Sequence, residues 1–404
     1  MTPSPLHADS AAGVIARFLK ARGVDRIFGL CGGHIMPIWM RADAEGIRII
    51  DVRDERAAVY MAHAHSELTG QLGVALVTAG PGLTNAMTGI ANVHVARASV
   101  LVLSGGPPRA QEHRGALQDI VHTDLVRSIT CYARTVREPS LVLQELDEAV
   151  ARAFGQGCDP GPVYLDFPTD TLRADVPCVQ QLEEHFQPKP RPLLWPAANE
   201  VAAAVEMLWA AKRPLVISGR GARGAGAELC AFLDRLGAAY LDTGESKGLV
   251  PDDHPCVVAA MRGTVMGEAD LVITVGRRLD FQLAYGSPAI FGAARFVRIS
   301  DAPGELRDNR RGAVELFAQP AAALAAITHA ARGRTTQVDR DWVSGLRKRH
   351  VERASKLRDS MRKAPNGSGG TDLAQRKVAG RFAASLGTTR PCLQQLDAAL
   401  SNTE

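Results

Sequence analysis

The chain has 404 residues, of which 46% are hydrophobic and 22% are charged, and its formal net charge is +4. This length allows two or three domains with cores of their own, and the composition is typical of a soluble globular protein. The small net charge, without a basic run interleaved with aromatic residues, argues against nucleic-acid binding. The seven cysteines form neither a C-x-x-C pair nor a Cys/His cluster, so neither a disulfide framework nor a zinc site is predicted.

The amino terminus lacks the charged and apolar regions of a signal peptide. No apolar run approaches the roughly 18 residues that span a bilayer. We therefore expect a cytoplasmic protein, with neither a membrane nor nucleic acid as a partner.

Short apolar strands alternate with helices along residues 1–177. A helix capped by Asp9 or Ser10 precedes a strand over 26–30, and a helix over 35–44 and a strand over 48–52 follow. Strands over 73–79 and 100–104 are apolar throughout, which is typical of parallel strands buried on both faces. A strand over 161–168 is expected to be the last of this domain. The pattern predicts a doubly wound α/β domain with right-handed crossovers.

The second half of the chain repeats this pattern after a Pro-rich and charged stretch, 178–196, that is predicted to be a linker. A helix over 197–212 and strands near 214–218, 238–242, 271–275 and 296–299 predict a second parallel-sheet domain over 197–331. The remainder, 332–404, is predicted to hold a charged solvated helix (339–363), a flexible Gly/Ser joint (366–370) and a helix (392–400) whose leucine stripe needs a partner surface. The fold class is thus α/β, with two doubly wound parallel-sheet domains and a helical tail.

The stretch 51–104 holds the strongest candidate site. Glu55 opens a helix of small residues, and the turn Gly80-Pro81-Gly82 joins a buried strand to a helix that carries Asn85. An acid in the first turn of a helix can be there for the helix dipole alone, and the turn can be no more than a tight connection. However, a carboxyl among apolar neighbours that faces a glycine turn can also share a proton with a bound heterocycle.

Other motifs leave alternatives open. His34, in a Gly-Gly-His turn, can act as an acid or base near neutral pH, or can simply bond backbone at a helix start. The run Gly219-x-Gly221-x-x-Gly224, with Asp242 about 20 residues further on, meets the criteria for a dinucleotide fingerprint. No Cys/His or Tyr/Lys constellation for hydride transfer accompanies it, so a dehydrogenase is a weaker alternative.

Five motifs in order resemble the thiamine-diphosphate enzymes of the acetolactate synthase group. They are F-G-L-C-G-G-H-I-M-P-I (28–38), R-D-E-R-A-A (53–58), V-T-A-G-P-G-L-T-N-A (77–86), G-A-L-Q-D-I (115–120) and G-P-V-Y-L-D-F-P-T-D (161–170). The resemblance implies that 1–177 is the pyrimidine-binding domain and that 197–331 is a Rossmann-like central domain.

The resemblance also implies roles for single residues. Glu55 would hydrogen-bond the cofactor pyrimidine and favour the imino tautomer that deprotonates the thiazolium ring, and the resulting C2 carbanion would attack a 2-keto acid or aldehyde. His34 and Gln118 would face the substrate. The expected cofactor-lining positions, besides Glu55, are Gly33, Thr78, Gly80, Pro81 and Asn85.

Three departures from the group shape the prediction. No Gly-Asp pair occurs in the sequence, so the ligands of Mg²⁺ and the diphosphate are expected on a third domain that this chain lacks, although 390–400 resembles the opening of that domain. His34 and the segment 279–286 are closer to the branch that resembles 2-hydroxyacyl-CoA lyases and benzaldehyde lyase. The segment 261–266 replaces the flavin-contacting segment of the synthases, which argues against FAD.

The predicted function is therefore an acetolactate synthase-like, thiamine-diphosphate-dependent carboligase or lyase, with an implied role in branched-chain amino acid biosynthesis. We expect the isolated chain to be inactive and to work as a homo-oligomer or with a partner subunit that carries the diphosphate-binding domain. One alternative is a 2-hydroxyacyl-CoA or hydroxyketone lyase that acts on an acyl-CoA or aldehyde. Another is a non-catalytic fragment or subunit.

Overall fold

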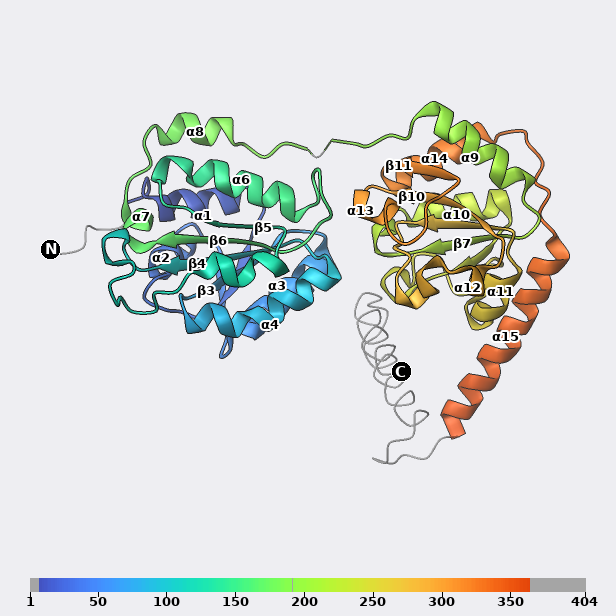
Figure 1. The fold of residues 1–404 in the computed structure, drawn as a ribbon, viewed down its shortest axis with the longest axis horizontal. Coiled ribbons are helices and arrows are strands. Elements are labelled where there is room, and N and C mark those ends of the chain that lie inside the picture. Colours follow the sequence, from blue (N-terminus) through green and yellow to red (C-terminus); the bar gives the residue numbers. More distant parts are fainter. Residues whose placement is uncertain (1–6, 191, 364–404) are drawn as a thin grey trace. The chain divides into compact units, whose positions relative to one another are not determined.

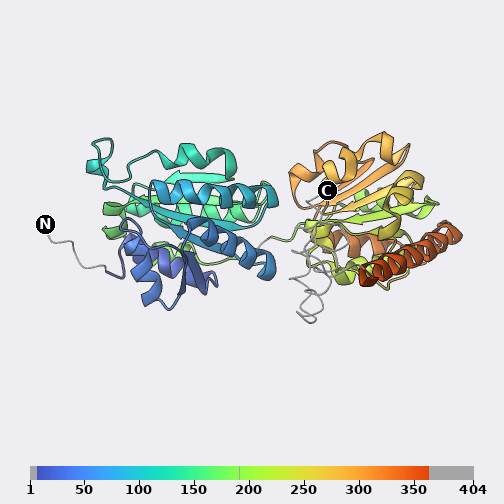
Figure 2. The ribbon, with the colours of Figure 1, turned by 90° about the horizontal axis from the view of Figure 1, so that it is seen from below.

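The computed structural model describes residues 7–190 and 192–363, with side chains to residue 360. The chain divides into two compact units, 1–191 and 192–404, and each is built on one parallel sheet with helices on both faces (Figures 1 and 2). The predicted fold class, α/β with two doubly wound parallel-sheet domains, is confirmed. The joint predicted at 366–370 and the helix predicted at 392–400 lie outside the described residues.

The first unit contains a six-stranded sheet with the strand order β2-β1-β3-β4-β6-β5. Its strands are β1 Arg26–Gly29, β2 Arg48–Asp51, β3 Gly73–Val77, β4 Val100–Gly106, β5 Tyr132–Thr135 and β6 Val163–Pro168. Its α-helices are α1 Ala11–Ala21, α2 Met36–Ala44, α3 Glu55–Thr69, α4 Pro81–Ala96, α5 His122–Val126, α6 Val142–Ala153, α7 Thr169–Arg173 and α8 Val179–His185.

The central strands of this sheet separate two hydrophobic cores. Successive side chains of a strand point to opposite faces, so Leu76 of β3 joins the core under α1, α2 and α6, whereas Val77 joins the core under α3, α4 and α5. All residues of β3 are buried, which explains why this strand is apolar without alternation.

Part of the segment predicted as a linker, 178–196, is helical and packs on the first unit. Leu182 of α8 and Phe186, which follows it, contact the core that includes α1. Arg22 donates to the Phe186 carbonyl oxygen at 3.1 Å, and Arg17 donates to Glu183 at 2.7 Å. The spacing of these apolar side chains fits one face of a helix, which the Pro-rich composition of the whole segment concealed.

The second unit contains a five-stranded sheet with the strand order β11-β10-β9-β7-β8. Its strands are β7 Pro214–Ser218, β8 Ala239–Leu241, β9 Leu271–Val275, β10 Arg295–Ser300 and β11 Val314–Phe317. Its α-helices are α9 Ala198–Ala210, α10 Gly226–Leu236, α11 Arg262–Glu268, α12 Pro288–Phe291, α13 Pro303–Leu306, α14 Pro320–Ala330 and α15 Arg340–Lys363.

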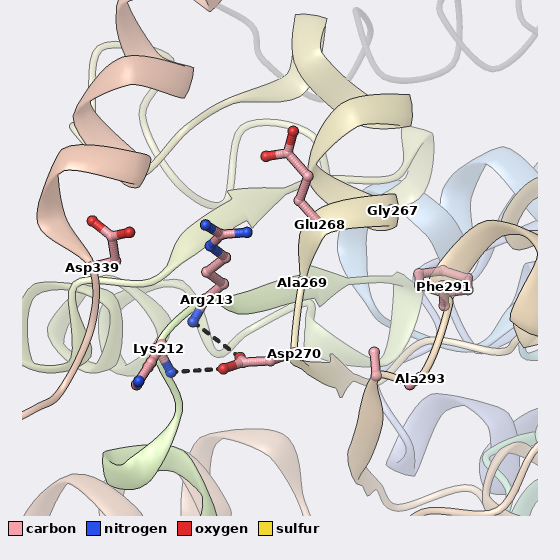
Figure 3. Close-up of a pocket in the computed structure, with 10 residues that line it drawn as sticks. Lys212, Arg213, Gly267, Glu268, Ala269, Asp270, Phe291, Ala293 and Asp339 are labelled. Atoms are coloured by element: carbon pink, nitrogen blue, oxygen red, sulfur yellow. Dashed lines mark hydrogen bonds between the residues drawn. The ribbon is translucent and has the colours of Figure 1, made fainter.

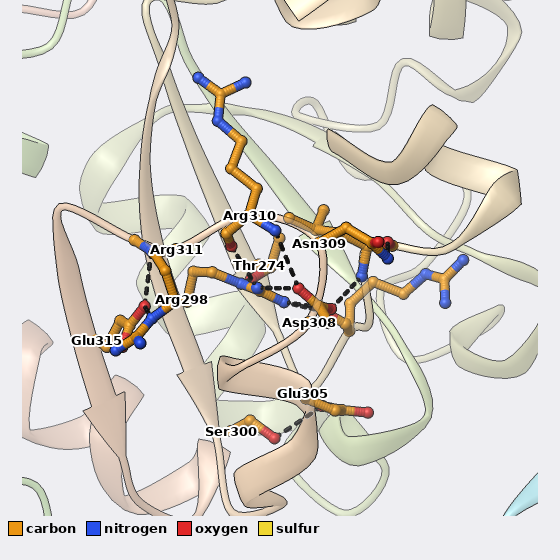
Figure 4. A network of polar contacts seen from close by, with 12 residues as sticks. Thr274, Arg298, Ser300, Glu305, Asp308, Asn309, Arg310, Arg311 and Glu315 are labelled. Carbon is orange, nitrogen blue, oxygen red and sulfur yellow. Dashed lines mark hydrogen bonds and ion pairs between the residues drawn. The ribbon is translucent and has the colours of Figure 1, made fainter. Parts of the chain in front are cut away.

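A buried arginine fixes the connection between β10 and β11 (Figure 4). The Arg298 side chain is 1% exposed and forms a bidentate ion pair with Asp308, in which Nη2 lies 2.9 Å from Oδ2. It also donates to the Arg310 carbonyl oxygen at 2.7 Å. Because a buried charge is tolerated only when it is paired and hydrogen-bonded, this cluster holds the loop 301–313 in one conformation.

Helix α15 was predicted to be solvated, and the structure corrects this for its first half. Leu346 is fully buried in the core of the second unit. Arg347 donates to the Val257 carbonyl oxygen at 2.8 Å, and His350 accepts from the Ala260 backbone at 3.0 Å. None of the helices in the described ranges combines the length and hydrophobicity needed to cross a membrane.

Candidate functional site

The candidate site lies at the carboxyl edge of the first sheet. Strands β1 and β3 are neighbours there, but the chain leaves β1 toward β2 at one side of the sheet and leaves β3 toward β4 at the other. Such a reversal of direction opens a crevice between the two connections, which is where open α/β sheets bind ligands. The connection after β1 carries Gly33 and His34, and the connection after β3 carries Thr78 and Gly80 and leads into Pro81, the first residue of α4.

Glu55 and Asn85 meet beside this crevice. Helix α3 begins at Glu55, and its capping residue Asp54 accepts from the Arg56 backbone at 2.9 Å. Glu55 is only 9% exposed, and its carboxylate accepts at Oε2 from Nδ2 of Asn85 at 2.5 Å. The two helices can approach this closely because α4 has Gly89 where a Cβ would lie 2.8 Å from Val59.

The Gly80-Pro81-Gly82 turn leaves room for this carboxylate. Gly80 has φ +59° and ψ −118°, a conformation that only glycine adopts without strain. Pro81 takes the first helical position of α4, where its missing N–H is not needed. A Cβ at Gly82 would lie 2.6 Å from the Thr78 methyl group and 3.4 Å from Oε1 of Glu55. Any larger residue at position 82 would therefore crowd both side chains.

His34 and Thr78 each present a buried polar atom that lacks a hydrogen-bond partner among the described residues: Nδ1 of His34 and Oγ1 of Thr78. Burial lowers the pKa of His34, and the Gln118 side chain acts in the opposite direction. The ring is therefore neutral near pH 7 and can exchange a proton with a bound group. Beside it, Gly33 faces open space, since a Cβ there would meet nothing within 4 Å.

Gln118 reaches the site from the loop between β4 and α5. Its backbone lies in the left-handed region, with φ +60°, and its Cβ lies 2.8 Å from the position that a Cβ would take at Gly80. Strained residues of this kind occur preferentially at functional sites. The structure thus brings together, on five different elements or loops at one sheet edge, Gly33, His34, Glu55, Thr78, Gly80, Pro81, Asn85 and Gln118.

Two buried residues behind the turn were not singled out from the sequence. His122 is 3% exposed and Asp166 is 4% exposed. Nε2 of His122 accepts from the Gly80 backbone at 2.8 Å, and Nδ1 lies 2.8 Å from Oδ2 of Asp166. The signal available in the sequence was the isolated carboxylate of Asp166 inside an otherwise apolar strand.

The glycine motif of the second unit serves packing between two loops. Gly221 donates to the Gly276 carbonyl oxygen at 2.9 Å, and a Cβ at Gly221 would lie 2.8 Å from the Gly276 Cα. These loops follow β7 and β9, the strands at which the second sheet reverses direction. Burial raises the pKa of Asp242, the residue that follows β8. The backbone of Gly221 is therefore in contact with protein at the place where a dinucleotide fingerprint would approach a pyrophosphate.

A pocket of about 450 Å³ in the second unit lies at the opposite, amino-terminal edge of its sheet (Figure 3). The Asp270 carboxylate in this pocket accepts from the backbones of Lys212 and Arg213 at 2.8 and 3.0 Å. These bonds tie the start of β7 to the start of β9, so the carboxylate has a structural role.

The first site suits a flat, nitrogen-containing ring. A buried carboxylate held by one amide can hydrogen-bond a ring nitrogen, and the buried hydroxyl and imidazole offer further polar contacts at the same crevice. Within the described ranges there is no group of three or more His, Cys, Asp or Glu side chains suited to a metal ion.

Comparison with known protein families identifies the family of this chain. Residues 9–126 match the model described as "Thiamine pyrophosphate enzyme, N-terminal TPP binding domain", and residues 201–327 match the central domain of the same enzymes. The two matches together cover more than half of the chain. The chain belongs to the thiamine pyrophosphate enzyme family. The resemblance drawn from the five motifs is thereby confirmed at the level of the family, and the crevice with Glu55 and Asn85 lies in the TPP-binding domain.

Relatives of this thiamine pyrophosphate enzyme chain carry lyase and decarboxylase names. It is 30% identical over 380 residues to 2-hydroxyacyl-CoA lyase 2 of Caenorhabditis elegans, covering 85% of this chain and 59% of that protein. It is 34% identical over 314 residues to 2-hydroxyacyl-CoA lyase 1 of Mus musculus, covering 76% and 53%. It is 30% identical over 355 residues to oxalyl-CoA decarboxylase of Escherichia coli (strain K12), covering 86% and 62%. The match thus spans little more than half the length of these relatives.

Proposed function

We propose that this chain supplies the pyrimidine-activating half of a thiamine-diphosphate-dependent lyase that cleaves a carbon–carbon bond in a 2-hydroxyacyl-CoA. The observation that carries the proposal is the buried Glu55 carboxylate, fixed by Asn85 at 2.5 Å beside the crevice. Membership of the family supports the cofactor. The choice of substrate is supported by the names of the relatives and by His34, which the synthase-like alternative does not require.

Glu55 would hold the pyrimidine ring through a hydrogen bond at a ring nitrogen. Asn85 occupies one of its carboxylate oxygens, and Gly82, which has no side chain, leaves room beside the other, Oε1. Thr78 Oγ1 would bond a polar group on the same ring, and Gly33, Gly80 and Pro81 would flank it. When bound, thiamine diphosphate supplies the electron sink that allows a bond next to a carbonyl carbon to break.

His34 would exchange the proton of the substrate hydroxyl. Its ring is neutral near pH 7 because burial lowers its pKa, so Nδ1 can accept a proton from a hydroxyl group that lies in the crevice. The Gln118 side chain acts on the same imidazole and would orient it. Replacing His34 by alanine should therefore abolish lyase activity, while an acetolactate synthase-like reaction would be affected less.

An acetolactate synthase-like carboligation of 2-keto acids is the second candidate. The five sequence motifs favour it, because they match that group in order, and both reactions use the same cofactor and the same Glu55. The two reactions differ in the substrate group that the site must accept. An assay that offers a 2-hydroxyacyl-CoA or a 2-keto acid as the substrate therefore distinguishes them.

We also propose that the diphosphate and Mg²⁺ are held outside the two units, on a further domain or a partner subunit. The matched models are those of the TPP-binding and central domains, and the relatives are longer than the matched region. A second copy of the chain is the proposed partner for α3 and α4, which expose Tyr60, Met61, Leu68 and Val95. Exposed apolar side chains on neighbouring helices are typical of protein interfaces.

Calorimetric titration of thiamine diphosphate with Mg²⁺ tests the proposal, first on the purified chain and then after addition of any co-purifying partner. We expect tight binding with the partner and a lyase reaction with a 2-hydroxyacyl-CoA, which His34→Ala abolishes. Formation of acetolactate from pyruvate without carbon–carbon bond cleavage of a 2-hydroxyacyl-CoA would instead support the second candidate. Failure to bind the cofactor under every condition would mean a non-catalytic subunit and would refute the proposal.

A further inference from the structure

A buried chain of hydrogen bonds connects strand β6 to the turn at the start of α4. Asp166 lies on β6, His122 is the first residue of α5, and Gly80 directly precedes the first residue of α4 in the connection from β3. The imidazole bridges the other two, with both polar contacts at 2.8 Å. Both side chains are at least nine-tenths buried, so water does not compete strongly for these bonds.

The chemistry of the partners fixes the protonation of the ring. The Gly80 backbone N–H can only donate, so Nε2 of His122 must be an unprotonated acceptor. Nδ1 must then carry the proton and donate it to the Asp166 carboxylate. The arrangement therefore requires a neutral imidazole in one tautomer, and the carboxylate selects that tautomer.

The bond to Gly80 controls the geometry of the candidate site. Gly80 has a backbone conformation that only glycine adopts readily, with φ +59° and ψ −118°, so its peptide needs a partner to define its orientation. The peptide is followed directly by the first turn of α4, which carries Gly82 and Asn85, and Gln118 packs against it. The His122 imidazole thus links β6 to the Gly80 turn and, through that turn, to the loop that carries Gln118.

We propose that His122, oriented by Asp166, is a positioning residue: its unprotonated Nε2 fixes the Gly80 turn, and protonation of the ring releases that turn. This role rests on the proposed function only where turnover is concerned. A proton added at Nε2 would point at the Gly80 N–H, so two donors would face each other and the bond would be lost.

The pair is reachable from solvent on one side. His122 and Asp166 line a cavity of about 170 Å³ at the carboxyl ends of β4 and β6, through which protons can exchange. Two other titratable groups interact with the pair: the Tyr164 hydroxyl lies 3.3 Å from Oδ2 of Asp166, and His34 interacts electrostatically with His122. The remaining titratable and charged groups that face the pair line the cavity and are Glu112, His113, Asp119 and Arg137.

The test uses two variants of the full chain that separate the proposed bond from simple filling of space. In His122→Gln, the amide oxygen can still accept from Gly80 while the amide N–H₂ donates to Asp166. In His122→Ala, neither bond is possible. The control is His185→Gln, an exposed histidine on α8. The readout is amide hydrogen exchange at Gly80, corrected for the intrinsic pH dependence, together with the ring nitrogen resonances of His122 in NMR spectra.

We expect the Nδ1–H tautomer at neutral pH and similar Gly80 protection in the wild type, His122→Gln and the control. Protection should fall roughly tenfold in His122→Ala, the effect of losing one hydrogen bond. On acidification the wild type should lose Gly80 protection, whereas His122→Gln, which has no ring to protonate, should keep it. A charged ring or the other tautomer at neutral pH, or equal protection in wild type and His122→Ala, would overturn the proposal.

Turnover supplies a second, independent test in the assembly that binds thiamine diphosphate. We expect His122→Ala to lower kcat with little change in KM, and His122→Gln to restore kcat. Unchanged kcat in His122→Ala would overturn the positioning role. Absence of the proposed reaction in the wild type would count against the proposed function alone, because the exchange and tautomer measurements need no substrate.

Discussion

Replacement of Glu55 by glutamine separates a catalytic carboxylate from a structural one. Glutamine has nearly the same size and can still accept from Asn85, but it carries no charge and cannot take up a proton. The native residue is 9% exposed, and its carboxylate accepts from Asn85 at 2.5 Å. It also stands in the first turn of α3, where the helix dipole favours a negative charge.

The expected change in stability is small. Converting a charge-assisted hydrogen bond into a neutral one removes about 1 kcal/mol, and the loss of charge at the helix start removes about 0.3–1 kcal/mol. A neutral amide is easier to bury than a carboxylate, which offsets part of this loss. The free energy of unfolding should therefore fall by less than about 2 kcal/mol.

The expected change in activity is much larger. A positioned group that handles a proton in the transition state contributes about 10²–10⁴-fold to the rate, which corresponds to roughly 3–6 kcal/mol of barrier at about 1.4 kcal/mol for each tenfold. Turnover in the assembly that binds thiamine diphosphate should thus fall at least 100-fold, while urea unfolding shows a folded protein. Glu138→Gln, which changes an exposed carboxylate of the same unit, is the matched control and should leave both quantities unchanged.

Two results would refute this reasoning. Full activity in Glu55→Gln would mean that the carboxylate takes no part in activating the cofactor. A loss of activity that merely follows the unfolded fraction would mean that Glu55 acts only through stability. The rate and the free energy of unfolding must therefore be measured on the same preparations.

Two further predictions concern stability. Asp308→Ala leaves the buried Arg298 guanidinium unpaired, so the free energy of unfolding should fall by about 3–5 kcal/mol. The control, Arg311→Ala, breaks the exposed pair with Glu315 and should change the free energy of unfolding by less than about 1 kcal/mol. Equal effects of the two variants in urea unfolding would contradict the role of the network. Because burial lowers the pKa of folded His34 below its ordinary value of 6.5, the unfolded chain binds more protons just below that pH, and stability should fall as the pH falls from 6.5 toward the folded pKa. His34→Gln should reduce this slope, and an unchanged slope would show that His34 is not buried as described.

The local sequence was sufficient for the elements, and it singled out Glu55, His34 and the glycine turn, whereas Gly33, Thr78 and Gln118 entered the candidate site through the family resemblance. Strands such as β3 are buried on both faces, so their continuous apolar runs mark a parallel sheet without further information. Glu55 was recognisable because an acid opened a helix of small residues, and Gly80 because a glycine turn followed a buried strand. These signals work because each depends on neighbours within a few residues along the chain.

Contacts between distant segments were decided by the tertiary structure. Asn85 could be placed near Glu55 only through resemblance, since 30 residues separate them and the contact depends on how closely α3 and α4 pack at Gly89. The bond from Gly80 to His122 spans 42 residues, and the Arg298–Asp308 pair forms only when β10 is buried between β9 and β11.

The amino-acid sequence by itself determined that this chain folds into two parallel α/β units, and it marked an acid at a helix start and a glycine turn after a buried strand in the first of them. Only the tertiary structure decided which polar groups are buried, and therefore which must be paired. Burial raises the cost of an unpaired donor, acceptor or charge, and it depends on every element that packs around the group. For this reason the partners of Glu55, His122 and Arg298 follow from the packing of the whole unit.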